Sequence, residues 1–303
     1  MDIYHDRTPA RQGGILTMGV FDGVHKGHQH LLKACKEWAE EVGTFTEVWL
    51  YHPHPRMVLH GIQVPVLTTL EERIALLKKE GVSVVRIIPF TRELSLLSGK
   101  RYIEEWIRAV SAPCGVVLGY DHRFGKERGG STHLLREEGF AVKEVAAFEW
   151  EGAPVSSSRV RRLLAEGAVS KAVELLGYPF LLQGVVRPGR QEARRLGVPT
   201  ANIPYPPEKL RLPAGIYVGW TQVGNYHDLP VRRGIPSLLY LPPEGDLEVH
   251  LLEGQKEGES LYGKSLSIGI LDRLRPHETF DDAHTLFLQI QADVEAAKAY
   301  FSL

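Results

Sequence analysis

Two histidines lie three residues apart in a glycine-rich stretch near the start of the chain. His25 and His28 stand on either side of Gly27 and follow the segment Phe21-Asp22-Gly23. Imidazole rings can donate hydrogen bonds to phosphate oxygens whose negative charge grows during attack at phosphorus. Glycines let the backbone approach a ligand closely. Together these residues indicate the transfer of a nucleotidyl group.

The elements around the histidines would point them at a phosphate. An apolar run at residues 14–20 predicts a buried strand, and a helix is expected to begin near Gly27. The unpaired N–H groups and positive dipole end of that helix would face the intervening loop, which suits an anion. Two other interpretations stay open: polar surface residues at a helix start, or zinc ligands.

Alternating strand and helix patterns continue to about Tyr178 and predict a parallel, doubly wound α/β sheet. Further strands are expected at 44–51, 82–89 and 115–119, and further helices at 70–79 and 100–110. Candidate ligand-binding residues follow two of these strands: the polar His54 and Arg56 follow the first, and the acidic Asp121 and the aromatic Phe124 follow the last. Strand ends hold ligands in such sheets, although a rigid turn and a solvated charged loop would also explain these segments.

A serine-rich segment precedes the next predicted helix. Serines 156–158 can cap its start, whereas Arg159 and two further arginines crowd its first turns, where the helix dipole disfavours positive charge. We therefore expect an anion near Ser157 and Arg159.

Beyond Tyr178 the pattern changes to short apolar strands separated by glycine and proline, which predicts a small antiparallel β-barrel. The expected strands are 180–186, 215–222, 237–241, 247–252 and 266–271. A terminal amphipathic helix at 282–300 is expected to pack on the barrel through Leu286, Ile290, Val294 and Ala297. The sequence thus predicts two domains, 1–178 and 179–303.

The stretch from Gly184 to Asn202 is a candidate for a second site. Its glycines permit close approach to phosphates, and Thr200 and Asn202 offer oxygen ligands of the kind that Mg²⁺ accepts. A hydroxyl nucleophile would also need a base, and Glu248 is the available carboxylate on a later strand. The alternative for Glu248 is an exposed strand residue.

Composition restricts the possible functions. The 303 residues are 43% hydrophobic, carry a formal net charge of −1 and include two cysteines. Such a chain is globular, and it lacks the charge imbalance of a nucleic-acid-binding protein. The absence of an apolar run of about 18 residues argues against a membrane span. We expect a cytoplasmic protein with small-molecule partners, and the sequence does not indicate its oligomeric state.

In their order along the chain, the motifs resemble those of the bacterial bifunctional FAD synthetases, which join riboflavin kinase to FMN adenylyltransferase. The matching segments are 19–28, 51–55, 119–125 and 155–161 in the first half, and 199–202, 248–250, 261–263 and 274–280 in the second. The first of these resembles the HxGH nucleotidyltransferases in particular. The resemblance covers nearly the whole chain. It implies that ATP phosphorylates riboflavin to FMN, and that a second ATP adenylylates FMN to FAD with release of pyrophosphate.

The resemblance also implies roles for individual residues. In the adenylyltransferase half, His25 and His28 would be catalytic, and ATP would contact Gly19, Phe21, Asp22, Gly23, His25, Gly27, His28, Ser157 and Arg159. The flavin substrate would contact His54, Arg56, Asp121 and Phe124. In the kinase half, Glu248 would be the general base, and Thr200 and Asn202 would hold Mg²⁺. The kinase ATP would contact Gly184, Gly189, Arg194, Gly197, Thr200 and Asn202.

The chain departs from the family pattern at several positions. His122 stands where phenylalanine is usual, Ala193 stands where glycine is usual, and segment 232–243 only faintly resembles its family counterpart. Because the last two lie in the second half, we expect both activities with the kinase the weaker. Two alternatives stay open. One is an FMN adenylyltransferase with a silent barrel, and the other is a flavin-responsive binding protein without turnover.

Overall fold

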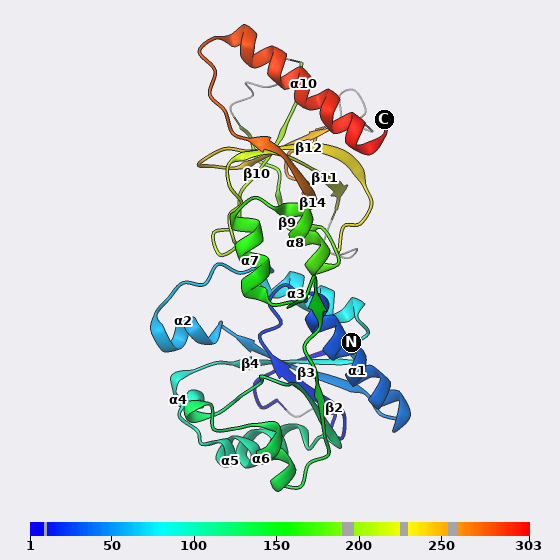
Figure 1. Cartoon of the computed structure of the whole chain (residues 1–303), viewed down its shortest axis with the longest axis vertical. Helices are drawn as coiled ribbons and strands as arrows, with labels where there is room; N and C mark the ends of the chain where they lie inside the picture. The colour runs from blue at the N-terminus through cyan, green and yellow to red at the C-terminus, as the bar shows by residue number, and fades with distance from the viewer. Residues whose placement is uncertain (9–10, 190–196, 225–229, 254–259) are drawn as a thin grey trace. The chain divides into compact units, whose positions relative to one another are not determined.

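The computed structural model describes residues 1–8, 11–189, 197–224, 230–253 and 260–303, which form two compact units (Figure 1). The first unit comprises Met1–Val64 and Arg73–Ser156, and the second comprises Pro65–Glu72 and Ser157–Leu303. A short segment from the middle of the first half therefore belongs to the second unit.

The first unit contains a six-stranded parallel sheet in the order β1-β4-β3-β2-β5-β6. Its strands are β1 (Asp2–His5), β2 (Ile15–Gly19), β3 (Thr46–His52), β4 (Val84–Pro89), β5 (Gly115–Gly119) and β6 (Val142–Val145). The chain moves from β2 outward to β3 and β4, then returns to place β5 and β6 on the other side. Strand order thus reverses between β2 and β5, and ligands of doubly wound sheets bind beyond the carboxyl ends at such a point.

Helices cover both faces of this sheet, as doubly wound topology requires. α1 (Lys26–Glu41) packs against Val117 of β5, whereas Val116 and Leu118 face the opposite cluster, because successive strand residues alternate between faces. That opposite face is covered by α4 (Arg92–Ser95), α5 (Gly99–Tyr102), the π-helix η1 (Ile103–Ser111) and α6 (Thr132–Glu137). The helix predicted at 100–110 is therefore one α-helical turn followed by a wider π-helical segment.

The remaining elements of the first half are short, with the exception of α3 (Leu70–Lys79). They are α2 (Pro55–His60), α3, the 3₁₀ turn η2 (Lys126–Arg128) and the hairpin of β7 (Glu149–Trp150) and β8 (Ala153–Pro154). α3 has the bounds that the sequence predicts.

The second unit is built on an antiparallel sheet in the order β10-β13-β12-β11-β14-β9. Its strands are β9 (Phe180–Val185), β10 (Ala201–Ile203), β11 (Gly215–Val223), β12 (Ile235–Leu241), β13 (Leu247–Leu251) and β14 (Ser265–Pro276). An isolated bridge between Arg187 and Asn202 links the two ends of this order. The predicted antiparallel barrel is therefore confirmed as a curled sheet.

The described helices that complete the second unit are α7 (Ser157–Ala165), α8 (Val169–Leu176) and α10 (Ala283–Phe301). In Figure 1, α10 lies across the sheet beside β11 and β12. Ala297 and Val294 of α10 pack against Ile216, Val218 and Leu238, so the predicted contact face is partly confirmed. No helix among the described residues is long and apolar enough to cross a membrane.

A fully buried ion pair crosses the core of the first unit. Glu47 on β3 accepts hydrogen bonds from Arg86 Nε at 3.1 Å, Trp49 Nε1 at 2.9 Å and Ser111 Oγ at 2.6 Å. Both charged side chains are 0% exposed. A buried charge that loses its partner is strongly destabilising, because the remaining charge is left without solvation.

We predict that Glu47→Ala lowers the free energy of unfolding by about 3–5 kcal/mol, because it leaves the Arg86 guanidinium buried and unpaired. Urea unfolding measures this change. Glu37→Ala is the control, since Glu37 pairs with Lys33 on the exposed face of α1. An exposed pair of this kind contributes at most about 0.5 kcal/mol. Equal losses in the two variants would contradict the assignment of Glu47 to the core.

Candidate active sites

The loop between β2 and α1 has an unusual backbone. Phe21, Gly23 and Val24 have φ values of 51°, 82° and 33°, all in the left-handed region. Non-glycine residues held in that region cost on the order of 1–3 kcal/mol each, and they persist only where the surrounding structure holds them. The loop follows the carboxyl end of β2, at the reversal of strand order. Its shape and place are those of a ligand-binding loop.

His25 and His28 are brought together at the start of α1. His25 is the N-cap residue, and its Nδ1 accepts a hydrogen bond from the backbone N–H of His28 at 3.3 Å. The two rings stack with their centroids 3.7 Å apart. A Cβ at Gly27 would lie 3.1 Å from His25 Nδ1 and 3.0 Å from the Val155 carbonyl oxygen. Glycine at position 27 therefore gives the His25 ring its space.

Burial keeps His28 neutral. Its pKa lies well below the usual 6.5, because the ring is removed from water and because His25 and Arg73 disfavour a further positive charge. Within the described part of the chain, His28 Nδ1 is buried and makes no hydrogen bond. A buried polar atom without a partner marks a place where a ligand can supply one.

The charged side chains of Asp22 and Lys26 both contact other side chains of the protein. Asp22 is buried and forms an ion pair with Arg73 of α3, whose Nη2 lies 3.3 Å from Asp22 Oδ1. Lys26 Nζ lies 3.8 Å from the centroid of the Trp150 ring. A direct contact of Asp22 with ATP therefore stays a prediction. Arg73 was missed by the sequence analysis, because it is 51 residues away from its partner in the chain.

The loop after β5 divides its predicted site residues between solvent and core. Asp121 is exposed, and its carbonyl oxygen accepts a hydrogen bond from Arg128 at 3.4 Å. Phe124 is 7% exposed and packs against Tyr102, with the ring centroids 5.4 Å apart. Between them, His122 has a pKa lowered from 6.5 to about 4, mainly because of burial. A flavin contact by Phe124 stays a prediction.

The other predicted residues of this half lie on two short elements. His54 is the N-cap of α2 and accepts a hydrogen bond from the Arg56 N–H at 3.2 Å, while the Arg56 side chain is exposed. They follow β3, which runs parallel to β2, so both strands end at the same edge of the sheet. Ser157 and Arg159 lie on α7 in the second unit, and their role at the triphosphate stays a prediction.

In the second unit, strand register brings the predicted kinase residues together. Asn202 on β10 is the register partner of Glu248 on β13, and Thr200 Oγ1 donates to Glu248 Oε2 at 3.1 Å. A Cβ at Gly189 would collide with the Asn202 side chain where it now lies, so glycine at 189 lets the two approach closely. Gly184 is packed in the same way against Ile203. Gly197 is exposed with φ 78°, and Arg194 lies outside the described residues.

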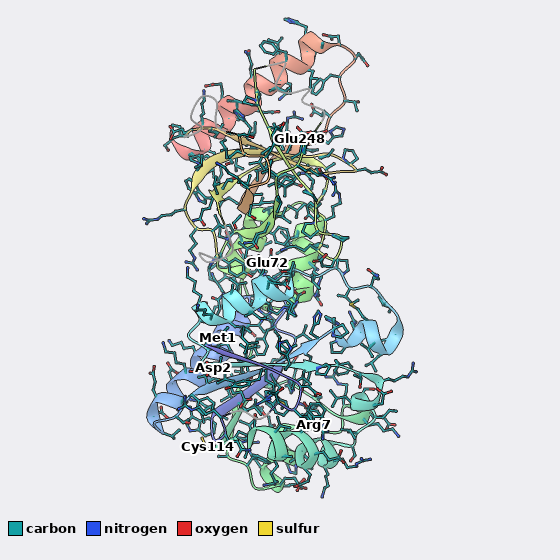
Figure 2. All side chains as sticks on the ribbon, turned by 180° about the vertical axis from the view of Figure 1, so that it is seen from behind. Met1, Asp2, Arg7, Glu72, Cys114 and Glu248 are labelled. Carbon is teal, nitrogen blue, oxygen red and sulfur yellow. The ribbon has the colours of Figure 1, made fainter. Side chains whose placement is uncertain are left out.

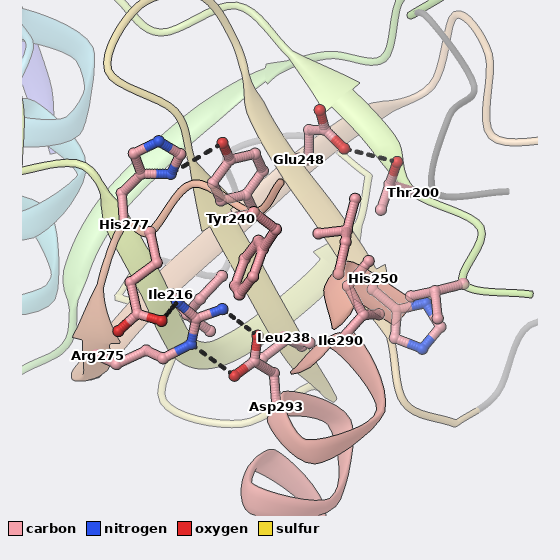
Figure 3. Close-up of a pocket in the computed structure, with 14 residues that line it drawn as sticks. Thr200, Ile216, Leu238, Tyr240, Glu248, His250, Arg275, His277, Ile290 and Asp293 are labelled. Atoms are coloured by element: carbon pink, nitrogen blue, oxygen red, sulfur yellow. Dashed lines mark hydrogen bonds and ion pairs between the residues drawn. The ribbon is translucent and has the colours of Figure 1, made fainter. Parts of the chain in front are cut away.

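Thr200 and Glu248 line a pocket between the curled sheet and α10 (Figure 3). The pocket has a volume of about 230 Å³. Its other labelled walls are Ile216, Leu238, Tyr240, His250, Arg275, His277, Ile290 and Asp293. Figure 2 marks Glu248 among the side chains of the second unit. Although many of these residues carry polar groups, the surface that they expose to the pocket is mostly apolar, which suits an aromatic ligand.

Two polar contacts hold the far side of this pocket. Arg275 Nη2 lies 2.7 Å from Asp293 Oδ2, which joins β14 to α10, and Tyr240 Oη lies 3.3 Å from His277 Nδ1. None of these four was expected as a site residue, although Arg275 and His277 lie in the matching segment 274–280. The apolar face of the last helix was a further signal, because Leu286 and Ile290 line the pocket rather than only packing on the barrel.

Comparison with known proteins decides the family. Residues 7–159 match the FAD synthetase family, and residues 176–301 match the riboflavin kinase family. A Listeria monocytogenes protein named bifunctional riboflavin kinase/FMN adenylyltransferase is 31% identical over 95% of this chain and 92% of its own length. The protein of the same name from Escherichia coli K12 is 31% identical over 99% and 96%. The chain belongs to this bifunctional family.

Membership of the riboflavin kinase/FMN adenylyltransferase family confirms the resemblance seen in the motifs. A crystal structure of a Streptococcus pneumoniae protein, described as a macrolide-efflux protein, matches with a TM-score of 0.87 and 24% identity. The match covers 98% of this chain and 99% of that one. At that identity it shows the shared fold alone.

We predict that His122→Phe makes the protein less sensitive to acid. Between pH 6.5 and about 4 the unfolded chain binds a proton at His122 that the folded chain does not, so stability falls as the pH is lowered through this window. The drop in unfolding free energy between pH 7.5 and pH 5 should shrink by about 1–2 kcal/mol in the variant. Urea unfolding at the two pH values measures it. An unchanged drop would contradict the lowered pKa of His122 in the folded protein.

Proposed function

We propose that the first unit adenylylates FMN and that the second unit phosphorylates riboflavin. The observation that carries this proposal is the presence of two separate constellations, the stacked histidines beyond β2 and the Thr200–Glu248 pair beside an apolar pocket. The family matches end at residue 159 and resume at 176, so the domain boundary predicted after Tyr178 remains part of the proposal. The cytoplasmic location remains an expectation too.

In the adenylyl transfer, a phosphate oxygen of FMN attacks the α-phosphorus of ATP. The bond to the β-phosphate breaks, and pyrophosphate leaves with the electron pair. His25 and His28 donate hydrogen bonds to the phosphate oxygens, while the N-terminus of α1 favours their charge. Positioning and charge stabilisation carry most phosphoryl-transfer catalysis, so no covalent enzyme intermediate is needed.

In the kinase reaction, the 5′-hydroxyl of riboflavin attacks the γ-phosphorus of ATP, and ADP leaves. Glu248 takes the hydroxyl proton, which requires the carboxylate to be aimed at the nucleophile. The hydrogen bond from Thr200 supports that aim, at 3.1 Å to Glu248 Oε2. The apolar walls of the neighbouring pocket would hold the flavin ring.

We further propose that Mg²⁺ assists the kinase half. Within the described residues, no group of three or more His, Cys, Asp or Glu side chains is placed to hold a metal ion. Thr200 and Asn202 instead supply neutral oxygen atoms beside the Glu248 carboxylate. Mg²⁺ commonly takes only one or two protein ligands and completes its shell with water and phosphate oxygens, so this donor set fits. When bound, Mg²⁺ would neutralise phosphate charge.

An FMN adenylyltransferase with a silent barrel is the second candidate. It was suggested by Ala193, which lies outside the described residues, and by the unusual segment 232–243. That segment forms β12, which pairs with β11 and β13 and contributes Leu238 and Tyr240 to the pocket wall. Because it retains a structural role at the pocket, its unusual sequence does not favour a silent barrel.

We predict that two single substitutions separate the activities. His28→Ala should lower FAD formation from FMN by about 10²–10³-fold, because it removes a donor to the transition-state charge. Glu248→Gln should lower FMN formation from riboflavin by about 10²–10⁴-fold, because it removes the base and keeps the side-chain shape. Separation of the flavins after incubation with Mg-ATP and either riboflavin or FMN measures both. Each variant is the other's control, and loss of both activities in either would contradict the two-site proposal.

A further inference from the structure

We propose that Arg73 is a positioning residue for adenylyl transfer, acting by holding the loop of residues 20–24 in the shape that the ATP phosphates require. This inference rests on the proposed function of the first unit. Arg73 lies on α3, outside every motif that the sequence analysis singled out. Its guanidinium donates hydrogen bonds to the loop that precedes His25.

The Arg73 side chain donates hydrogen bonds to two residues in the first part of the loop. Its Nη1 donates to the Val20 carbonyl oxygen at 3.0 Å, and its Nη2 donates to Asp22 Oδ1 at 3.3 Å. The Arg73 and Asp22 side chains are only 3% and 2% exposed. Charges buried to this degree interact strongly and resist displacement, because separating them would leave each one unsolvated. The ion pair therefore fixes the loop where it leaves β2.

The far end of the loop is held independently. Gln29 of α1 donates from Nε2 to the Val24 carbonyl oxygen at 2.8 Å. The segment that these contacts hold, residues 20–24, contains Phe21, Gly23 and Val24, its three residues with positive φ. A loop in this conformation needs support from its surroundings. Arg73 and Gln29 supply that support from two different helices, and His25 follows directly.

The shape of the guanidinium group explains why arginine suits this place. Two nitrogens of one planar fork reach a backbone carbonyl and a carboxylate at once, whereas a lysine ammonium is a single point charge on a flexible stem. Because its charge is paired with Asp22, Arg73 affects ATP binding indirectly, by fixing the position of the loop that contacts the phosphates. A displacement of about 1 Å in such a loop can cost roughly 100-fold in rate.

The test compares Arg73→Met and Arg73→Lys with the unchanged protein. For FAD formation from FMN, we expect Arg73→Met to raise the KM for ATP about tenfold and to lower kcat/KM about 100-fold. Arg73→Lys should recover part of the loss and stay within about tenfold of the unchanged kcat/KM, since it keeps the charge that pairs with Asp22. The KM for FMN, and FMN formation from riboflavin in the same sample, should stay within about twofold.

Arg86→Lys is the matched control, because Arg86 is an equally buried arginine paired with a carboxylate in the same unit. It has no contact with the loop among its hydrogen bonds to Glu47, Asp6 and Thr8. A loss of folded protein lowers the apparent kcat of both reactions and leaves KM unchanged. In FAD formation, the Arg86→Lys control should therefore have the same KM for ATP as the protein without substitutions.

The proposal is overturned if Arg73→Met has the same KM for ATP as the protein without substitutions. It is also overturned if Arg86→Lys raises the KM for ATP as much as Arg73→Lys does. If Arg73→Met fails to fold, the KM for ATP of Arg73→Lys tests the proposal instead. A rise of about threefold or more in its KM for ATP supports the fork geometry, and an unchanged KM refutes it. If the unchanged protein forms no FAD from FMN, the proposed function fails, which is a different result from failure of the role of Arg73.

Discussion

Backbone hydrogen bonding between neighbouring strands is the constraint on which both sites depend. In the first unit, parallel pairing of β2 with β3 and β5 brings three carboxyl ends to one edge, where the loops at residues 20–24 and 120–130 begin. In the second unit, antiparallel pairing sets Glu248 opposite both Asn202 and Tyr240. A shift of one residue would turn Glu248 to the other face of the sheet. Register therefore decides which side chains can act together.

Local patterns were sufficient for the elements that carry the chemistry. The apolar run before Gly19, the glycine-rich loop and the helix start near Gly27 correspond to β2, the loop and α1. The spacing of apolar residues predicted the bounds of α3, and a short apolar run predicted those of β5. These segments are predictable because their burial pattern and their sequence pattern agree. The proximity of His25 and His28 followed from their spacing, although their stacking did not.

What the sequence could not predict depends on contacts between distant segments. β1 is short and mostly exposed, so it has no apolar pattern, and β10 has only three residues. The pocket joins side chains of the matching segments 199–202, 248–250 and 274–280 to those of β11, β12 and α10, and no local pattern shows that these segments meet around one cavity. Arg73 belongs to the same class, because an ordinary helical arginine acquires its role only when α3 places it beside Asp22. Each side chain became significant through tertiary packing.

The most direct test of two independent sites is complementation between variants. Equal amounts of His28→Ala and Glu248→Gln protein are mixed with riboflavin and Mg-ATP, and FAD is measured over time. We predict that the mixture forms FAD from riboflavin far faster than either protein alone, because FMN made by the first is adenylylated by the second. A mixture that forms FAD no faster than the single proteins would contradict the assignment of the two reactions to separate sites.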